Sequence, residues 1–303
     1  MKRFWKHAGV TVGTALVTGA IVSACAHDDS SLFIRNALAP LTQTNGICQY
    51  TGDVTQTGLA VGLLDVAYGG TVYVPEFLLG NQIVTSANLD SVQTETSRII
   101  VTGAITRITD LDGNNIPNML QAMCSGGDKA ACKAGQDASP LFSQGLPPNP
   151  FSTEEAEAIE PGDGTTASYL AMPITIVDGT TVSIILDYFE QKEAILPGSA
   201  IGSSIELLTY TKAEGHTLGG DAEESNEFEF PVTLCYGCLI TNLLTDTASA
   251  VGHCLAPGGS AGASTLPCTP GQDVPVTVAQ GTIPGIANCP GDGGIAADAG
   301  DGG

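Results

Sequence analysis

The chain has 303 residues, of which 32 are acidic and only 10 are basic, so its net charge is −22 at pH 7. Such an excess of carboxylates repels phosphate backbones and anionic lipid headgroups, which proteins bind through lysine and arginine. The composition therefore excludes nucleic-acid binding and leaves a cationic partner or a divalent metal ion open. The length is enough for one large or two small domains.

Residues 1–25 have the layout of a bacterial export signal. Lys2, Arg3 and Lys6 form a positive head, an uncharged apolar stretch follows, and small residues stand just before Cys25. This order of segments is typical of a cleaved secretory signal. A transmembrane anchor needs about 20 predominantly apolar residues, whereas this stretch is shorter and is diluted by threonine and glycine.

The tetrapeptide 22–25, Val-Ser-Ala-Cys, resembles the lipobox of bacterial lipoproteins. The resemblance implies cleavage before Cys25 and its lipidation by several acyl chains, palmitate among them, which together anchor a protein stably. Ala26 follows instead of an aspartate, which implies the outer membrane of the cell envelope. Residues 1–24 carry three basic residues and no acidic one, so the mature protein has a net charge of −25.

Many short strand-like segments separated by turn signals predict an all-β fold, with a disulfide-stapled β-sandwich or barrel-like domain. One or two short helices, a long loop insertion and a coil-rich C-terminal segment complete this prediction. The predicted order is a signal peptide, the lipidated cysteine with its tether, a β domain, a Cys/Gly/Pro-rich extension and a disordered tail, over residues 1–24, 25–31, 32–240, 241–289 and 290–303.

In the first part of the domain, residues 31–41 are expected to form a brief helix. The apolar and β-branched runs 59–68 and 71–79 are separated by a Gly-Gly pair, as in a β-hairpin. Residues 92–110 are the longest strand candidate, because their apolar side chains follow an imperfect period of two.

The segment from about 117 to 167 is rich in Gly, Pro, Ser and Ala and has few large apolar residues. We therefore expect a long loop insertion and not a second domain. Within it, Ser152 and Glu155 fit a capping box that would open a helix of one or two turns, which Pro161 would end.

Three further strands are predicted over 169–177, 204–212 and 227–234. Pro231 lies in the last of them and indicates an edge strand or a bulge. Residues 180–191 combine a helical apolar spacing with a β-branched run, and we favour a helix.

The mature part contains eight cysteines besides Cys25, and an even number in an exported chain indicates disulfides. Cys124 and Cys132 are close in sequence and are expected to pair with each other. Eight cysteines allow 105 connectivities, so the remaining pairs stay open. At least one bridge is expected between the start of the domain and its C-terminal cysteines. The eight are Cys48, Cys124, Cys132, Cys235, Cys238, Cys254, Cys268 and Cys289.

Cys235 and Cys238 have the C-x-x-C spacing of redox motifs and of half-zinc sites. A redox site of the thioredoxin type would stand at a helix start within a βαβ pattern, which the sequence lacks. A zinc site would have to recruit His253 and Cys254, since a second C-x-x-C is absent. Structural disulfides are the better interpretation in an oxidising compartment.

Asp110, Asp112 and Asn114 offer oxygens at positions one, three and five of a calcium loop. The glycine at position six and the glutamate at position twelve of an EF-hand are missing. A turn explains the same residues, so Ca²⁺ remains a weaker alternative to no cofactor.

Residues 258–262 match the G-x-S-x-G motif of serine hydrolases, but no histidine follows Ser260 and the surroundings predict coil. The mature histidines His27, His216 and His253 are scattered along the chain. A hydrolase would need one of them to meet Ser260, or a pair of carboxylates, in space. The sequence has no P-loop, no dinucleotide-binding fingerprint and no H-E-x-x-H.

Several segments resemble uncharacterised cysteine-rich lipoproteins of myxobacteria and related bacteria. That resemblance implies no activity and carries no catalytic residue. We therefore expect a non-enzymatic envelope lipoprotein with a structural or interaction role, a divalent-cation or ligand-binding module as the alternative, and a secreted hydrolase as the third. The resemblance rests on residues 31–35 (SLFIR), 80–82 (GNQ), 94–98 (TETSR), 217–220 (TLGG) and 235–239 (CYGCL).

Overall fold

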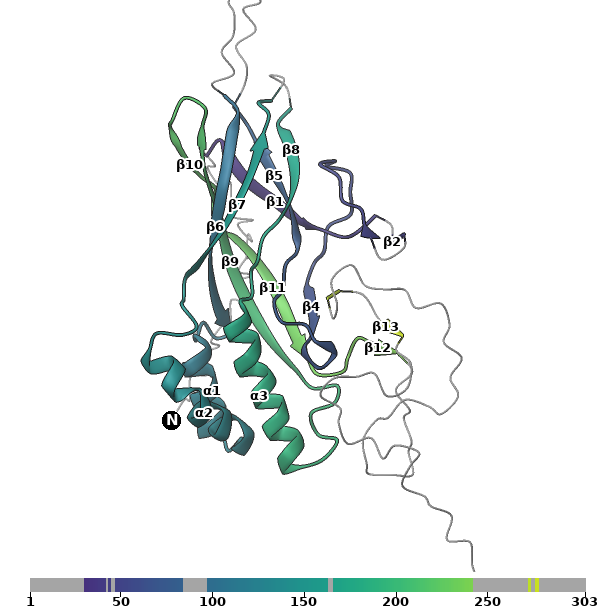
Figure 1. The fold of residues 1–303 in the computed structure, drawn as a ribbon, viewed down its shortest axis with the longest axis vertical. Coiled ribbons are helices and arrows are strands. Elements are labelled where there is room, and N and C mark those ends of the chain that lie inside the picture. Colours follow the sequence, from purple (N-terminus) through teal and green to yellow (C-terminus); the bar gives the residue numbers. More distant parts are fainter. Residues whose placement is uncertain are drawn as a thin grey trace, which may run out of the picture.

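The structure is a computed structural model and describes residues 30–41, 43–44, 47–83, 97–162, 166–241, 272–273 and 276–277. These residues form thirteen strands, three α-helices and one short 3₁₀ helix (Figure 1). The elements are β1 (Leu32–Leu38), β2 (Gln43–Thr44), β3 (Ile47–Cys48), β4 (Gly62–Asp65), η1 (Val66–Tyr68), β5 (Glu76–Asn81), β6 (Ile99–Asp110), α1 (Ile116–Ser125), α2 (Lys129–Ser143), β7 (Phe151–Ile159), β8 (Ser168–Pro173), α3 (Gly179–Ile195), β9 (Ser204–Thr217), β10 (Ala222–Glu224), β11 (Phe228–Cys235), β12 (Ile240–Thr241) and β13 (Val276–Thr277).

Most strands belong to two sheets, so the prediction of a strand-rich fold is confirmed. The smaller sheet is antiparallel and has the order β1-β5-β8. The larger sheet has the order β4-β11-β9-β6-β7, with β10 paired to β9, and only its β4–β11 pair is parallel. The short pairs β2–β3 and β12–β13 lie outside both sheets.

Aromatic side chains from the two sheets meet in one hydrophobic core. Phe77 of β5 is fully buried, and its ring centroid lies 5.5 Å from that of Phe228 and 6.2 Å from that of Phe230, both on β11. Tyr73, which precedes β5, stacks on Phe230 at 6.5 Å. Edge-to-face and offset aromatic pairs of this kind favour a defined packing of the two sheets.

The three helices lie together at one end of the sheets, at the bottom of Figure 1. The Asp128 side chain caps α2 and also accepts a hydrogen bond from the Tyr188 hydroxyl of α3 at 2.9 Å. The disulfide Cys124–Cys132 joins the end of α1 to the start of α2. No helix in the described part of the chain is long and apolar enough to cross a membrane.

The loop insertion predicted over 117–167 is wrong, because these residues contain α1, α2 and β7. Alanines form much of the buried face of α2, and small side chains let neighbouring helices approach closely. Such a core contains few large apolar residues, so the composition of this segment did not indicate it. The capping box at Ser152 and Glu155 does not start a helix either, since both lie in β7, which pairs with β6.

Two predictions near the start of the domain are also wrong. Residues 32–38 form β1 and not a helix, because their backbone pairs with β5. β4 and β5 belong to different sheets and do not form a hairpin. Between them Asp65 caps the helix η1, and Gly69 ends it with a φ of +97°, a conformation that favours glycine.

The later predictions agree better with the structure. Residues 99–110 are the strand β6, and the predicted strands over 169–177, 204–212 and 227–234 largely coincide with β8, β9 and β11. The helix favoured over 180–191 is α3. β11 is not an edge strand, because β9 pairs with one side of it and β4 with the other. β4 reaches only Val232–Cys235, however. Among the described residues, Pro231 therefore has a strand partner on the β9 side alone.

Candidate functional site at the end of strand β4

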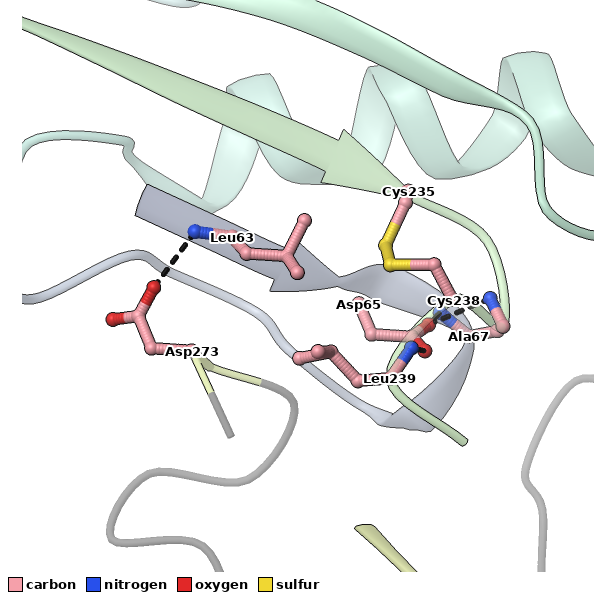
Figure 2. The surroundings of a disulfide bond; sticks show 8 residues. Leu63, Asp65, Ala67, Cys235, Cys238, Leu239 and Asp273 are labelled. Carbon is pink, nitrogen blue, oxygen red and sulfur yellow. Dashed lines mark hydrogen bonds between the residues drawn. A yellow bond between two sulfur atoms is a disulfide. The ribbon is translucent and has the colours of Figure 1, made fainter. Parts of the chain in front are cut away.

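Asp65 ends β4 and is fully buried. Its Oδ1 accepts hydrogen bonds from the backbone N–H of Ala67 at 3.1 Å and of Gly237 at 2.8 Å, and its Oδ2 accepts one from Leu239 at 2.9 Å. In Figure 2 this carboxylate points at the loop that follows β11. One side chain therefore joins two loops that lie 172 residues apart in sequence.

Burial raises the pKa of the Asp65 carboxyl above its ordinary value, and the backbone hydrogen bonds from the two loops oppose this shift. Within the described residues Asp65 has no ion-pair partner. Burial without a counter-ion favours the protonated form of the carboxyl, whereas the hydrogen bonds from backbone N–H groups favour its ionised form. The two effects act on the same carboxyl in opposite directions, and burial is the larger of them.

The disulfide Cys235–Cys238 lies next to this carboxyl (Figure 2). Cys235 ends β11 and is 1% exposed, whereas Cys238 is exposed to solvent. A carboxylate oxygen of Asp65 and the two Sγ atoms lie within 4.8 Å of one another. Two thiols and a carboxylate are a possible ligand set for zinc, but the sulfurs are bonded to each other here and the Asp65 oxygens accept N–H groups.

Backbone hydrogen bonds hold the loop that carries the disulfide. The Tyr236 N–H donates to the Ser203 carbonyl at 3.1 Å, and the Gly202 N–H donates to the Tyr236 carbonyl at 2.8 Å. The Tyr236 ring is buried and lies 5.8 Å from the Phe189 ring of α3. The loop is therefore packed on its inner side and open only at Cys238.

The opposite edge of β4 is covered by residues 272–273. The Asp273 carboxylate accepts hydrogen bonds from the Leu63 N–H at 2.7 Å and from the Tyr73 hydroxyl at 2.8 Å. The Gln272 amide exchanges two hydrogen bonds with the Val74 backbone, at 3.0 and 2.8 Å. β4 is an edge strand of its sheet, and these contacts satisfy backbone groups that an uncovered edge leaves unpaired.

The structure confirms the one predicted cysteine pair and shows a second pair that the sequence left open. Cys124 bonds to Cys132, and Cys235 bonds to Cys238. Cys48 is also in a disulfide. The predicted lipidation site Cys25 and the cysteines Cys254, Cys268 and Cys289 lie outside the described residues.

The calcium candidates form a turn between β6 and α1. The Asp110 Oδ1 accepts hydrogen bonds from the backbone N–H of Asp112 and Asn114, at 2.9 and 2.7 Å, and its Oδ2 accepts one from the Asn114 amide nitrogen at 2.9 Å. Gly113 has a φ of +82°. The Asp110 oxygens that calcium would need already bind the turn, and Asn114 presents a donor to them.

The hydrolase candidates are not brought together by any described contact. Ser260, His27 and His253 lie outside the described residues. His216 lies in β9 between Ile100 of β6 and Ala222 of β10. Strand pairing within the larger sheet therefore accounts for the position of His216.

The sequence singled out Cys235 and Cys238, but not the two carboxyls of the site, Asp65 and Asp273. Asp65 is the only charged residue in the run 59–68, and a charge inside an apolar run was the available signal. Asp273 lies in a Gly- and Pro-rich stretch where no pattern indicates contact with β4. Its proximity to Leu63 and Tyr73 depends on about 200 residues of intervening chain.

A second unusual carboxyl is Glu76, the first residue of β5. Burial first, and then the negative charges of Glu157 and Glu155, raise its pKa to about 7. The folded protein therefore holds a proton on Glu76 that the unfolded chain releases between about pH 4.5 and pH 7. The free energy of unfolding falls as the pH rises through this window, because the unfolded state ionises more easily.

We expect Glu76→Gln to remove this penalty. The variant should equal the wild type in stability at pH 4 and exceed it by about 1–2 kcal/mol at pH 8, after allowing for the partial exposure of the side chain. Urea unfolding at both pH values measures this difference. The exposed Glu206→Gln is the control and should change stability equally at both; identical pH profiles for Glu76→Gln and the wild type would contradict the prediction.

Comparison of the chain with protein families, with curated proteins and with solved structures finds no match in any of the three.

Proposed function

We propose that the protein is an exported lipoprotein of the cell envelope, held by lipid at Cys25, with a structural or binding role and no catalysis. The domain on this tether is a disulfide-stapled, sandwich-like arrangement of two curled sheets. The observation that carries the proposal is that all five cysteines among the described residues are in disulfides, in a chain that begins with a lipobox-like signal. Disulfides persist in oxidising compartments and are rare in the cytosol.

The charge of the mature chain supports the same role. A surface with far more carboxylates than basic groups keeps a tethered domain soluble and apart from anionic membranes. It also favours partners that present cationic surfaces. The proposed outer-membrane location rests on Ala26 in place of aspartate.

Replacing Cys25 by serine tests the tether. With several acyl chains attached, the wild type should remain in the membrane fraction, and intact mass should show the lipid on Cys25. Cys25→Ser should be at least tenfold depleted from that fraction and should carry no lipid. Ser23→Ala keeps a small residue before the cysteine and should behave as the wild type; an unlipidated Cys25→Ser protein that still cofractionates with membranes would refute the proposal.

A further inference from the structure

We propose that Cys235–Cys238 is an exchange-active disulfide, which a dithiol partner reduces by attack at Cys238 while Asp65 supplies a proton to Cys235. This function goes beyond a structural staple and does not depend on the lipid tether. Cys124–Cys132 serves in the same molecule as the structural disulfide for comparison.

Only one of the two cysteines of this disulfide is exposed to solvent. Cys238 is exposed, while Cys235 is 1% exposed at the end of β11. Thiol–disulfide exchange begins when a thiolate attacks an accessible sulfur in line with the bond that breaks. The geometry therefore directs the attack to Cys238 and makes Cys235 the leaving sulfur. In Cys124–Cys132 both residues are half-buried and no such asymmetry exists.

The loop does not need the disulfide to keep its place. The N–H groups of Gly237 and Leu239 bind the Asp65 carboxylate, and Tyr236 is bonded to the 202–203 turn. Gly237 has a φ of +76°, which glycine adopts at little cost. Reduction therefore leaves these contacts in place, so the loop can accept and lose the bond reversibly.

The stabilisation expected from this bridge as a staple is smaller than that expected from Cys124–Cys132. In the chain-entropy treatment a disulfide contributes more when it closes a longer loop. Cys235 and Cys238 are separated by three positions, while Cys124 and Cys132 are separated by eight and join two helices.

Asp65 is placed to exchange the proton that the leaving sulfur needs. Its oxygen and the two Sγ atoms lie within 4.8 Å of one another, and burial raises the pKa of its carboxyl. Tyr236 lies in the same loop, and burial, followed by the charges of Glu190 and Glu193 of α3, raises its pKa to about 12. Lys192 of α3 is a cation close to this loop: its Nζ donates a hydrogen bond to the Ser203 Oγ at 2.8 Å, and the Ser203 carbonyl accepts the Tyr236 N–H.

The reaction is balanced with a dithiol as the partner. A partner thiolate attacks the Sγ of Cys238, the S–S bond breaks, and its electron pair goes to the Sγ of Cys235, which takes the proton from Asp65. The second partner thiolate then attacks the partner sulfur of the mixed disulfide and releases Cys238 as a thiolate. In sum, two electrons pass from the partner, which becomes a disulfide, to the protein. One proton moves from Asp65 to Cys235, and solvent then supplies the protons that the Cys238 thiolate and the Asp65 carboxylate take up.

The test measures both disulfides in the same full-length protein. The probe is dithiothreitol at graded concentrations, followed by thiol alkylation and peptide mass analysis. We expect Cys235–Cys238 to be reduced at least tenfold faster than Cys124–Cys132, while near-ultraviolet circular dichroism stays native. Equal rates, or loss of the native spectrum together with reduction of Cys235–Cys238, would overturn the proposal.

Single cysteine variants test the direction of attack. Cys235→Ser leaves the exposed Cys238, which should form a mixed disulfide with oxidised glutathione at least tenfold faster than the buried Cys235 that remains in Cys238→Ser. Equal rates in the two variants would contradict the assignment of Cys238. Retention of Zn²⁺ by the reduced wild type, in place of exchange, would show a metal site instead.

Asp65→Asn tests proton transfer through the pH dependence of the reduction rate, because the substitution also weakens hydrogen bonds that hold the loop. Asparagine cannot donate a carboxyl proton, so reduction of Cys235–Cys238 should slow by about tenfold relative to Cys124–Cys132. The ratio of the two rates should vary with pH in the wild type and should lose that variation in Asp65→Asn. An equal pH dependence of this ratio in both proteins, or a faster reaction in Asp65→Asn, would refute the role of Asp65.

Discussion

Replacing Asp65 by alanine should destabilise the oxidised protein by about 3–5 kcal/mol. The substitution removes the acceptor for the N–H groups of Ala67, Gly237 and Leu239 in a place that water does not reach. A buried donor left unpaired costs about 1–3 kcal/mol, and partial rearrangement keeps the total below the sum of three. The loss should appear in the free energy of unfolding from urea denaturation at pH 7.

Two further substitutions serve as comparisons for the loss of stability in Asp65→Ala. Asp65→Asn keeps one carbonyl oxygen and should lose about 1–3 kcal/mol, less than alanine. Asp112 is exposed in the turn after β6, and Asp112→Ala should stay within about 0.5 kcal/mol of the wild type. A loss below about 1 kcal/mol for Asp65→Ala would mean that the two loops are held together by other contacts.

Replacing Gly103 by alanine should destabilise the fold by about 2–3 kcal/mol. Gly103 lies at a bulge in the middle of β6, where the register shifts toward both β7 and β9. A Cβ atom there would lie 2.1 Å from the carbonyl oxygen of Thr153, a backbone atom of the neighbouring strand. Relief requires β7 to move away from β6, which loses hydrogen bonds and strains the sheet.

Gly135 provides the matched control for this substitution. It lies inside α2, and a Cβ atom there would meet only the Leu120 Cβ, at an ordinary distance of 3.8 Å. Gly135→Ala should therefore stabilise the protein by about 0.5–1 kcal/mol, since alanine favours the helix and restricts the unfolded chain. Thermal unfolding of both variants measures the two signs; destabilisation of equal size at both sites would contradict the explanation from close strand approach.

The site combines a motif that is local in the sequence, C-x-x-C, with a carboxyl that is distant from it, Asp65. The C-x-x-C motif indicated structural disulfides at Cys235 and Cys238, but their partners were left open, and the structure bonds the two to each other. Asp65 stands 170 residues earlier, and the parallel pairing of β4 with β11 places it beside Cys235. A parallel pair joins segments that are distant in the chain, so no local spacing predicts this neighbour.

The sequence by itself determined features that depend on neighbouring residues. Alternation of apolar residues predicted β6 and β11, a helical apolar spacing favoured α3, and the short spacing of Cys124 and Cys132 indicated their bridge. The composition set the acidic net charge, and the order of residues 1–25 indicated the lipobox-like signal. Each of these follows from side-chain periodicity or chain proximity, which the fold does not alter.

The tertiary structure decided the rest, because the deciding contacts are distant in sequence. Residues 32–38 became a strand through pairing with β5, and the alanines of α2 became part of a core where α2 packs against α1 and α3. β4 and β5 were assigned to different sheets although a Gly-Gly pair links them. Burial of Asp65 between two loops likewise arises only when β4 and β11 meet, and that burial gives the carboxyl its raised pKa.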